Sequence, residues 1–464
     1  MNVVFSSEQQ KCKEMKKLQT ILTLLCVPVF GLYAQKPMTL KDCMEFASKH
    51  STQILATQEV YAQTKINRRD AVLGVFTPQI NAYAGLALTN GRTTDPETNM
   101  YTDLKMFQDE YQIYASMPLF NGFEAVNNMK ISKIALESGK KSEEVKTDEI
   151  CLLIMQHFYN FLYFSKMTKV VESEKQAAQT ALQKAEKEFS LGNKSRVEVL
   201  EKQSFLAETE YKLADFEAQR NTAFSALKKV MMFSSDEVLE IDTAVNFSPV
   251  LTDFSSEAQN VATSAKENNA QILISENTLK TKELQFKTAK WQFFPKIDLN
   301  AGWYSSHSKI SGVNYQVPSF GEQIKNNGKT YISVSLNVPI FNRLQKFSEF
   351  SRRKSDFKIA NYEFQEKQAE IENAVLEAFD EALSAQKKLT AAQKAADYQK
   401  EYYDIAAKKF QEGLIPYLEF NTAANKYLEA QALYFNALFV SRIKNAVIEY
   451  YKGVSYLGQL TMEN

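Results

Sequence analysis

The chain has 464 residues, of which 44% are hydrophobic and 24% charged, a composition that suits a globular protein and leaves its function open. Its 55 Lys and Arg balance its 55 Asp and Glu, so no basic field attracts nucleic acid, and we expect no nucleic-acid partner. Three histidines, His50, His157 and His307, lack metal-ligand spacing, and no phosphate-binding glycine loop or nucleophile elbow occurs, so we expect no metal, no cofactor and no catalysis.

The N-terminal segment has the pattern of a secretory signal peptide. Two lysines precede the apolar residues 18–33, and a small-residue cleavage site follows Ala34, which predicts a signal over residues 1–34. Cys26 within it is a weak candidate for lipidation, because Leu25 is larger than such a signal requires. Cys43 and Cys151 fall on separate predicted helices; a disulfide between them stays open, and we favour free thiols. After the signal, no run of eighteen apolar residues predicts a transmembrane helix, so any membrane residence requires strands.

The first half of the mature chain, residues 35–232, predicts a helix, two strands and a helical hairpin. The helix is expected near residues 39–73. Apolar and polar residues then alternate over residues 79–88 and 111–119, which indicates two strands separated by a loop over residues 89–109. Residues 122–232 contain almost no Gly or Pro besides Gly192, and their heptad spacing predicts a coiled-coil hairpin that turns at this glycine.

Residues 233–254 break the helical rhythm and predict a linker, after which residues 255–464 repeat the first half. A helix is expected near residues 255–292, strands at about 296–304 and 330–340, and a loop over residues 305–329 between them. A second hairpin, at about 344–452, turns at Gly413.

The two halves are duplicates of each other. Residues 76–80 recur as residues 293–297 at a shift of 217, and residues 117–121 recur as residues 338–342 at a shift of 221. Prolines stand at all four junctions between strands and helices, where a fixed φ and a missing N–H let the backbone change direction. These junction residues are Pro78, Pro118, Pro295 and Pro339.

Four strands of about ten residues are long enough to cross a hydrocarbon layer, but they are too few to close a membrane barrel. An open sheet edge in lipid leaves backbone groups unpaired, so closure requires further copies of the chain. The polar members of the alternating strands would then line a water-filled pore while the apolar members face lipid. The expected lumen residues are Asn81, Gln112, Ser116, Asp298, Asn300, Ser333 and Asn337.

From residue 39 to about residue 457 the chain resembles the TolC-like outer membrane efflux protein family. The resemblance is carried by the duplication, the two strands per half, the proline junctions, the long hairpins, and a turn glycine followed six places later by an acid, as in Gly192 to Glu198 and Gly413 to Glu419. It implies a mainly α-helical protein with membrane β-strands, in which three protomers form a twelve-stranded β-barrel continued by an α-helical barrel through the periplasm.

The resemblance also implies functional residues and partners. The two turns would form the tip that contacts a periplasmic adaptor, a membrane fusion protein, and nearby acids would ring the entrance of the channel. The implied tip residues are Leu191, Gly192, Asn193, Glu412, Gly413 and Leu414, and the implied entrance acids are Glu198, Glu419 and, as a third, Glu201. Ile415 and Thr422 depart from the family pattern, which predicts that other contacts hold the closed entrance.

The expected function is an outer-membrane channel that works with the adaptor and an inner-membrane transporter, in drug efflux or in type I secretion of proteins. The transporter selects the cargo, so this sequence does not separate small molecules from proteins. The alternative is a soluble secreted or periplasmic coiled-coil interaction protein, since most residues lie in heptad-bearing helices. The consistent phase of the four alternating strands favours the channel.

Overall fold

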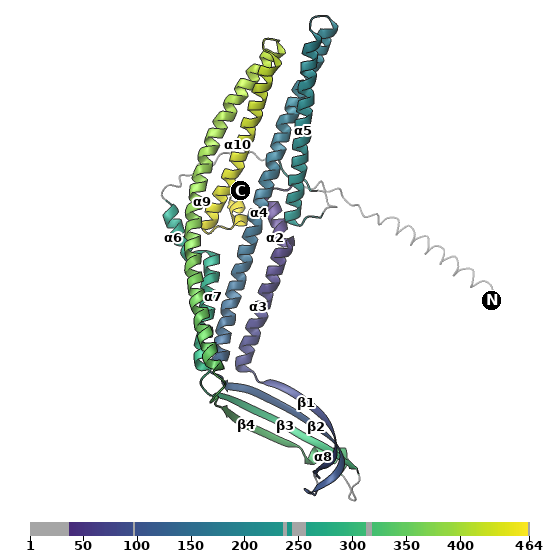
Figure 1. The fold of residues 1–464 in the computed structure, drawn as a ribbon, viewed down its shortest axis with the longest axis vertical. Helices are drawn as coiled ribbons and strands as arrows, with labels where there is room; N and C mark the ends of the chain where they lie inside the picture. The colour runs from purple at the N-terminus through teal and green to yellow at the C-terminus, as the bar shows by residue number, and fades with distance from the viewer. Residues whose placement is uncertain (1–36, 96–97, 235–238, 244–256, 312–317, 463–464) are drawn as a thin grey trace, which may run out of the picture.

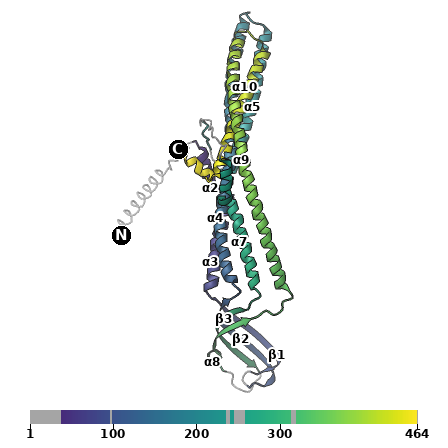
Figure 2. The same ribbon diagram turned by 90° about the vertical axis from the view of Figure 1, so that its left-hand side faces the viewer.

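The protein is a long, slightly bent rod with a β-sheet at one end and two helical hairpin tips at the other (Figure 1). The computed structural model describes residues 37–95, 98–234, 239–243, 257–311 and 318–462. The C-terminus lies beside the helices near the middle of the rod in both views (Figure 2). The expected signal peptide, residues 1–34, and most of the expected linker, residues 233–254, lie outside the described residues.

Two helices of 67 residues each, α4 (Glu124–Ser190) and α9 (Gln345–Gln411), run from the sheet to the tips. At 1.5 Å per residue each is about 100 Å long. From the tips α5 (Arg196–Met231) and α10 (Tyr417–Tyr451) return to the middle of the rod, and α3 (Thr52–Phe76) and α7 (Ala270–Trp291) accompany the other half of the long helices. In each repeat the long helix is therefore accompanied by a second helix toward the tip and by another toward the sheet (Figure 1).

The single helices expected near residues 39–73 and 255–292 are each broken in two. α2 (Leu40–His50) is followed by α3, and α6 (Ala258–Asn268) is followed by α7. The breaks fall at Ser51 and Asn269, which adopt an extended conformation with ψ of 118° and 132°. Ser and Asn favour helix caps over helix interiors, so both positions suit a helix break that uses no Gly or Pro.

The sheet is antiparallel in the order β1 (Gln79–Thr94), β2 (Tyr101–Phe120), β3 (Lys296–Ser311) and β4 (Lys329–Asn337). The loops expected over residues 89–109 and 305–329 are wrong in large part. β1 and β2 stay paired out to Thr94 and Tyr101, and β3 continues to Ser311. These extensions carry polar residues on both faces, so the apolar face of the inner strand segments does not continue into them.

The second repeat differs from the first at the far end of the sheet. A short helix, α8 (Phe320–Asn326), precedes β4, and β4 ends at Asn337 rather than near residue 340. Ser319 and Glu322 form a reciprocal capping box at the start of this helix.

The main hydrophobic core lies at mid-length, where α2, α4, α5, α10 and the C-terminal helix α11 (Tyr456–Met462) meet. Cys43 and Cys151 are both buried in this core as free thiols. Burial raises the pKa of each thiol to about 12, so neither is a nucleophile at neutral pH. Within the described residues, no helix is both long and apolar enough to cross a membrane.

Candidate functional site

The strand register separates polar from apolar residues on the two faces of the sheet. Directly paired residues point to the same face, so the pairs Gln79 with Ser116, Ser116 with Asn300 and Asn300 with Ser333 define one continuous polar face. All seven residues expected to line the lumen lie on this face, namely Asn81, Gln112, Ser116, Asp298, Asn300, Ser333 and Asn337.

Side chains on the polar face bond to one another across strands. Gln112 Nε2 donates to the Tyr331 hydroxyl at 3.2 Å, and Asn300 Nδ2 donates to Ser335 Oγ at 3.4 Å. The opposite face presents large apolar side chains to the exterior, with Leu86 74% and Ile332 81% exposed. A contiguous apolar surface of this kind indicates contact with lipid or with another protein.

The four junction prolines lie where the sheet meets the helices. Pro78 and Pro295 each directly precede a strand, Pro339 follows β4, and Pro118 lies beside a β-bulge near the end of β2. Next to the bulge is a glycine that the sequence analysis did not single out, Gly122. It has φ of +69°, and a Cβ there would lie 2.6 Å from the Trp291 carbonyl oxygen, so this tight turn requires glycine. The Asn-Gly pair was its sequence signal.

The two hairpin tips share one turn geometry. Gly192 and Gly413 have φ of +78° and +75°. In the first tip the Gly192 N–H donates to the Phe189 carbonyl and the Asn193 N–H to the Glu188 carbonyl, which is a Schellman motif. The second tip repeats both bonds, from Gly413 to Phe410 and from Leu414 to Lys409. The predicted tip residues therefore form two equivalent exposed turns at the end of the rod.

The two leading acid candidates, Glu198 and Glu419, occupy the third position of their helices but differ in their contacts. Ser195 Oγ caps the Glu198 N–H, and Lys194 Nζ lies 3.3 Å from the Glu198 carboxylate. At the second tip Pro416 is the N-cap residue. Proline has no backbone N–H, so it cannot donate a hydrogen bond to the Glu419 carboxylate, as the N-cap residue of a capping box does. Glu419 is exposed and has no ion-pair partner among the described residues. Glu201 lies one turn beyond Glu198 and is half-buried.

A buried lysine below the tips was missed by the sequence analysis. Lys202 is 6% exposed, and its amine lies over the ring of Phe410, which stacks on Phe420 at 4.4 Å. Burial and the nearby Lys194 lower the pKa of Lys202 to about 7, while Glu201 and Glu198 oppose the shift. Lys202 lies three residues after Val199, so both occupy the buried heptad positions of α5. A lysine at a position where the heptad pattern expects an apolar residue could have revealed it in the sequence.

Polar contacts also join the two hairpins below the tips. The Tyr417 hydroxyl donates to Glu208 Oε2 at 3.3 Å, and Lys212 Nζ donates to Asn425 Oδ1 at 2.7 Å. Lys184 Nζ donates to the Gln411 carbonyl at 3.4 Å. These bonds tie the α4–α5 hairpin to the α9–α10 hairpin close to the predicted entrance.

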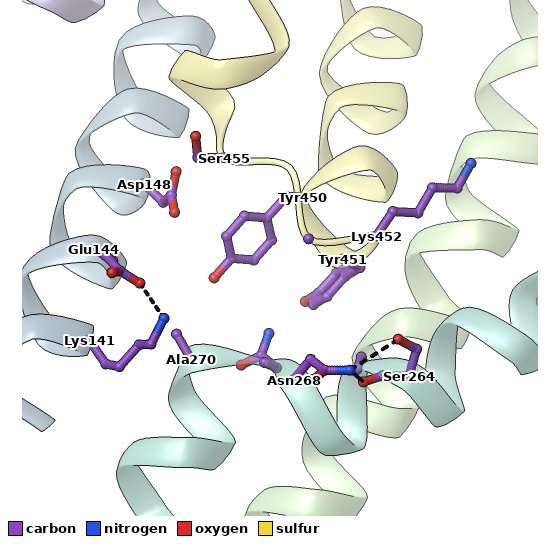
Figure 3. Close-up of a pocket in the computed structure, with 13 residues that line it drawn as sticks. Lys141, Glu144, Asp148, Ser264, Asn268, Ala270, Tyr450, Tyr451, Lys452 and Ser455 are labelled. Carbon is purple, nitrogen blue, oxygen red and sulfur yellow. Dashed lines mark hydrogen bonds and ion pairs between the residues drawn. The ribbon is translucent and has the colours of Figure 1, made fainter. Parts of the chain in front are cut away.

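A polar cavity of about 340 Å³ lies at mid-length, where α10 ends and α7 begins (Figure 3). Lys141 and Glu144 pair at 2.7 Å on its wall, and Asp148 accepts a bond from the Tyr456 N–H at 3.1 Å. Burial raises the pKa of Asp148 to about 6. Within the described residues, no cluster of His, Cys, Asp or Glu has the arrangement that would hold a metal ion.

Comparison with known proteins places this geometry in a family. A family model described as "Outer membrane efflux protein" matches residues 55–231 and again residues 261–439. The two matches fall in the two duplicated halves and together cover more than half of the chain. Among curated protein sequences, no significant match is found.

Solved structures share the fold over most of the chain. The outer membrane protein VceC of Vibrio cholerae is 14% identical with a TM-score of 0.69, and the match covers 90% of this chain and 96% of that one. A membrane protein of Pseudomonas aeruginosa is 13% identical with a TM-score of 0.70, covering 90% of both chains. The CmeC outer membrane channel of Campylobacter jejuni is 13% identical with a TM-score of 0.69, covering 90% and 85%. At these identities the matches establish the fold.

Proposed function

The chain belongs to the outer membrane efflux protein family and is located in the outer membrane, and from this premise we propose that three copies form a passive export channel. The channel has a twelve-stranded β-barrel in the membrane and an α-helical barrel in the periplasm. It exports small molecules or proteins together with a periplasmic adaptor and an inner-membrane transporter. The proposal includes no catalytic step.

One observation carries this proposal: a sheet with one polar face, one apolar face and two open edges. A hydrocarbon layer accepts the apolar face but not the unpaired edges, so four strands become stable there only when identical sheets join into a closed ring. Closure turns one face outward and the other inward. Since only the apolar face suits lipid, Asn81, Gln112 and the other polar residues line a water-filled pore.

The helices support the rest of the proposal. α4 and α9 continue from the sheet for about 100 Å and are too polar for lipid, so they extend through the periplasm. The exposed turns at Gly192 and Gly413 lie at the far end of the rod, where an adaptor would contact them. Glu198, Glu201 and Glu419 lie beside the turns, and three copies would gather them into a ring of negative charge.

The test is purification followed by electrical recording. We expect detergent-requiring, heat-modifiable trimers in the outer-membrane fraction that form stable ion-conducting pores in planar bilayers. A soluble periplasmic monomer without conductance would overturn the proposal and favour the coiled-coil interaction protein. Cross-linking at the tips in cells, followed by identification of the captured adaptor and transporter, tests the partners.

A further inference from the structure

The sheet has two open edges, the outer sides of β1 and β4. Within the described chain β1 pairs only with β2, and β4 pairs only with β3. Every residue of β4 is exposed, and Leu86 and Leu88 of β1 are 74% and 79% exposed. Strand edges attract other strands, and edges that lie in lipid must be paired. The β4 edge of one copy therefore has a natural partner in the β1 edge of another.

The internal duplication supplies a rule for strand register. β1 corresponds to β3 at a shift of 217, and β2 corresponds to β4 at a shift of 221. In the first hairpin Ile80 pairs with Ala115; adding the two shifts gives Ile297 and Leu336, which are paired in the second hairpin. The sequence shifts alone thus convert one observed register into the other.

The seam between β2 and β3 joins the first repeat to the second, and a seam between copies joins the second repeat to the first. Ile113 of β2 and Trp303 of β3 are an observed pair. Adding 221 to residue 113 gives Val334 of β4, and subtracting 217 from residue 303 gives Leu86 of β1. The barrel of the proposed function joins β4 of one copy to β1 of the next, and within that seam we propose a specific antiparallel register, with Val334 opposite Leu86 of the next copy.

This register keeps the two faces of the sheet intact across the seam. Ser333 comes opposite Ala87 and Ser335 opposite Gly85, on the polar face, while Ile332 comes opposite Leu88 on the apolar face. A slip of one residue would place apolar side chains of one copy on the polar face of the next. A slip of two residues leaves polar residues opposite polar-face positions, but its register no longer follows from the shifts of 217 and 221 that relate the two observed hairpins.

The same register explains why β4 stops at Asn337. In the first repeat, residues 117–120 of β2 lie beyond the last pair with β1 and are held by β3 alone. Their counterparts in the second repeat, residues 338–341, would be held by β1 of the next copy alone. In a single chain that strand is missing, so β4 ends after its last pair, Asn337 with Lys296. In the assembled protein, β4 would therefore extend to the end expected from the sequence, near residue 340.

Cysteine cross-linking tests the register with matched pairs. Val334→Cys is combined in turn with Leu86→Cys, Ala84→Cys and Leu88→Cys, all on the apolar face. Opposed residues have Cβ atoms about 5 Å apart and diagonal ones about 7 Å, so we expect at least about fivefold more cross-linked product with L86C than with A84C or L88C. Single-cysteine variants control for the buried Cys43 and Cys151. The pair S333C and A87C repeats the test on the polar face.

The outcomes separate the register from the proposed function. Reducible covalent dimers and trimers that form preferentially with L86C and with the polar-face pair support the register. A maximum at A84C or L88C overturns the register while the trimer remains. Trimers by native mass that cross-link in no pair overturn the joining of β4 to β1. A monomeric wild-type protein overturns the proposed function itself.

Discussion

Lys202 is the residue whose burial has the clearest energetic consequence. Its pKa of about 7 lies below the ordinary value of 10.5, so the folded protein favours the neutral amine. The unfolded chain binds more protons between pH 7 and 10.5, and this contribution to stability rises with pH over that window. Below pH 7 the charged amine remains buried, and its full cost is present.

We therefore expect Lys202→Met to stabilise the protein by about 1–3 kcal/mol at pH 6, because an apolar side chain of similar length replaces a buried charge. The advantage should shrink as pH rises toward 9.5. Thermal unfolding followed by circular dichroism at the two pH values measures it. Thr209→Val is the matched control, since Thr209 is buried in the same seam but does not titrate. An advantage independent of pH would show that packing rather than charge sets the difference.

Glu419 and Glu198 are expected to differ in function because, in the part of the chain that the structure describes, a lysine contacts Glu198 but none contacts Glu419. In a trimer, Glu419→Gln should weaken the block of the pore by Mg²⁺ about two- to tenfold, since three solvent-exposed charges are removed at once. Glu198→Gln should have a smaller effect. Single-channel recordings across a Mg²⁺ series measure both. Equal effects of the two variants would show that the contact with Lys194 does not mask Glu198.

At the scale of elements, α8 takes the place of a strand. The shift of 221 relates residues 322–326 of α8 to residues 101–105 of β2, so the fourth strand begins late and the edge of β3 beyond Tyr304 lacks a neighbouring strand. Gln323 closes this edge, because its amide accepts from the Ser308 N–H and donates to the Ser308 carbonyl, both at 2.9 Å. Asn327 adds a bond to the Ser306 carbonyl at 2.7 Å.

Gln323→Ala should open the edge of β3 at a local cost of about 1–2 kcal/mol, since both backbone groups of Ser308 lose their partner. Hydrogen exchange by mass spectrometry should show faster exchange in residues 305–311 and no change in β1. Glu322→Gln is the control, because its amide oxygen still accepts from the cap at Ser319. Unchanged exchange in the Gln323 variant would mean that the rest of α8 suffices to cover the edge.

These elements also show how far the sequence alone reaches. The turn glycines and the alternation of the inner strand segments each occur twice in the duplicated sequence. They predicted the two helical hairpins and the inner parts of the four strands, which the structure contains. The outer strand segments carry polar residues on both faces, so periodicity could not reveal them. The break at Ser51 uses no Gly or Pro, and only tertiary packing distinguishes it from a helix interior. For α8 a signal existed, because Ser319 and Glu322 have the spacing of a capping box.

On the scale of the whole molecule, one chain leaves apolar surface uncovered along its length. Besides the sheet, a groove of about 480 Å³ runs between α9 and α10, lined by small residues such as Ala385 and Ala392 and by Leu433, which is 55% exposed. Small residues along a helix pair admit the side chains of a neighbouring helix. The helical half and the sheet therefore point to the same conclusion, that further copies complete the fold.

The separation of the two faces can be tested at adjacent residues of β4. Val334→Lys places a charge on the face proposed to contact lipid, at a cost of about 2–4 kcal/mol per copy near the middle of the membrane, so the yield of trimers in the outer membrane should fall sharply. Ser333→Lys places the same charge on the face proposed to line water, where it stays hydrated, so trimers should form normally. Three lysines around the pore should then shift its ion selectivity toward anions, seen as a changed reversal potential in a salt gradient. The reverse outcome, with Ser333→Lys blocking assembly and Val334→Lys altering selectivity, would mean that the sheet curls the other way.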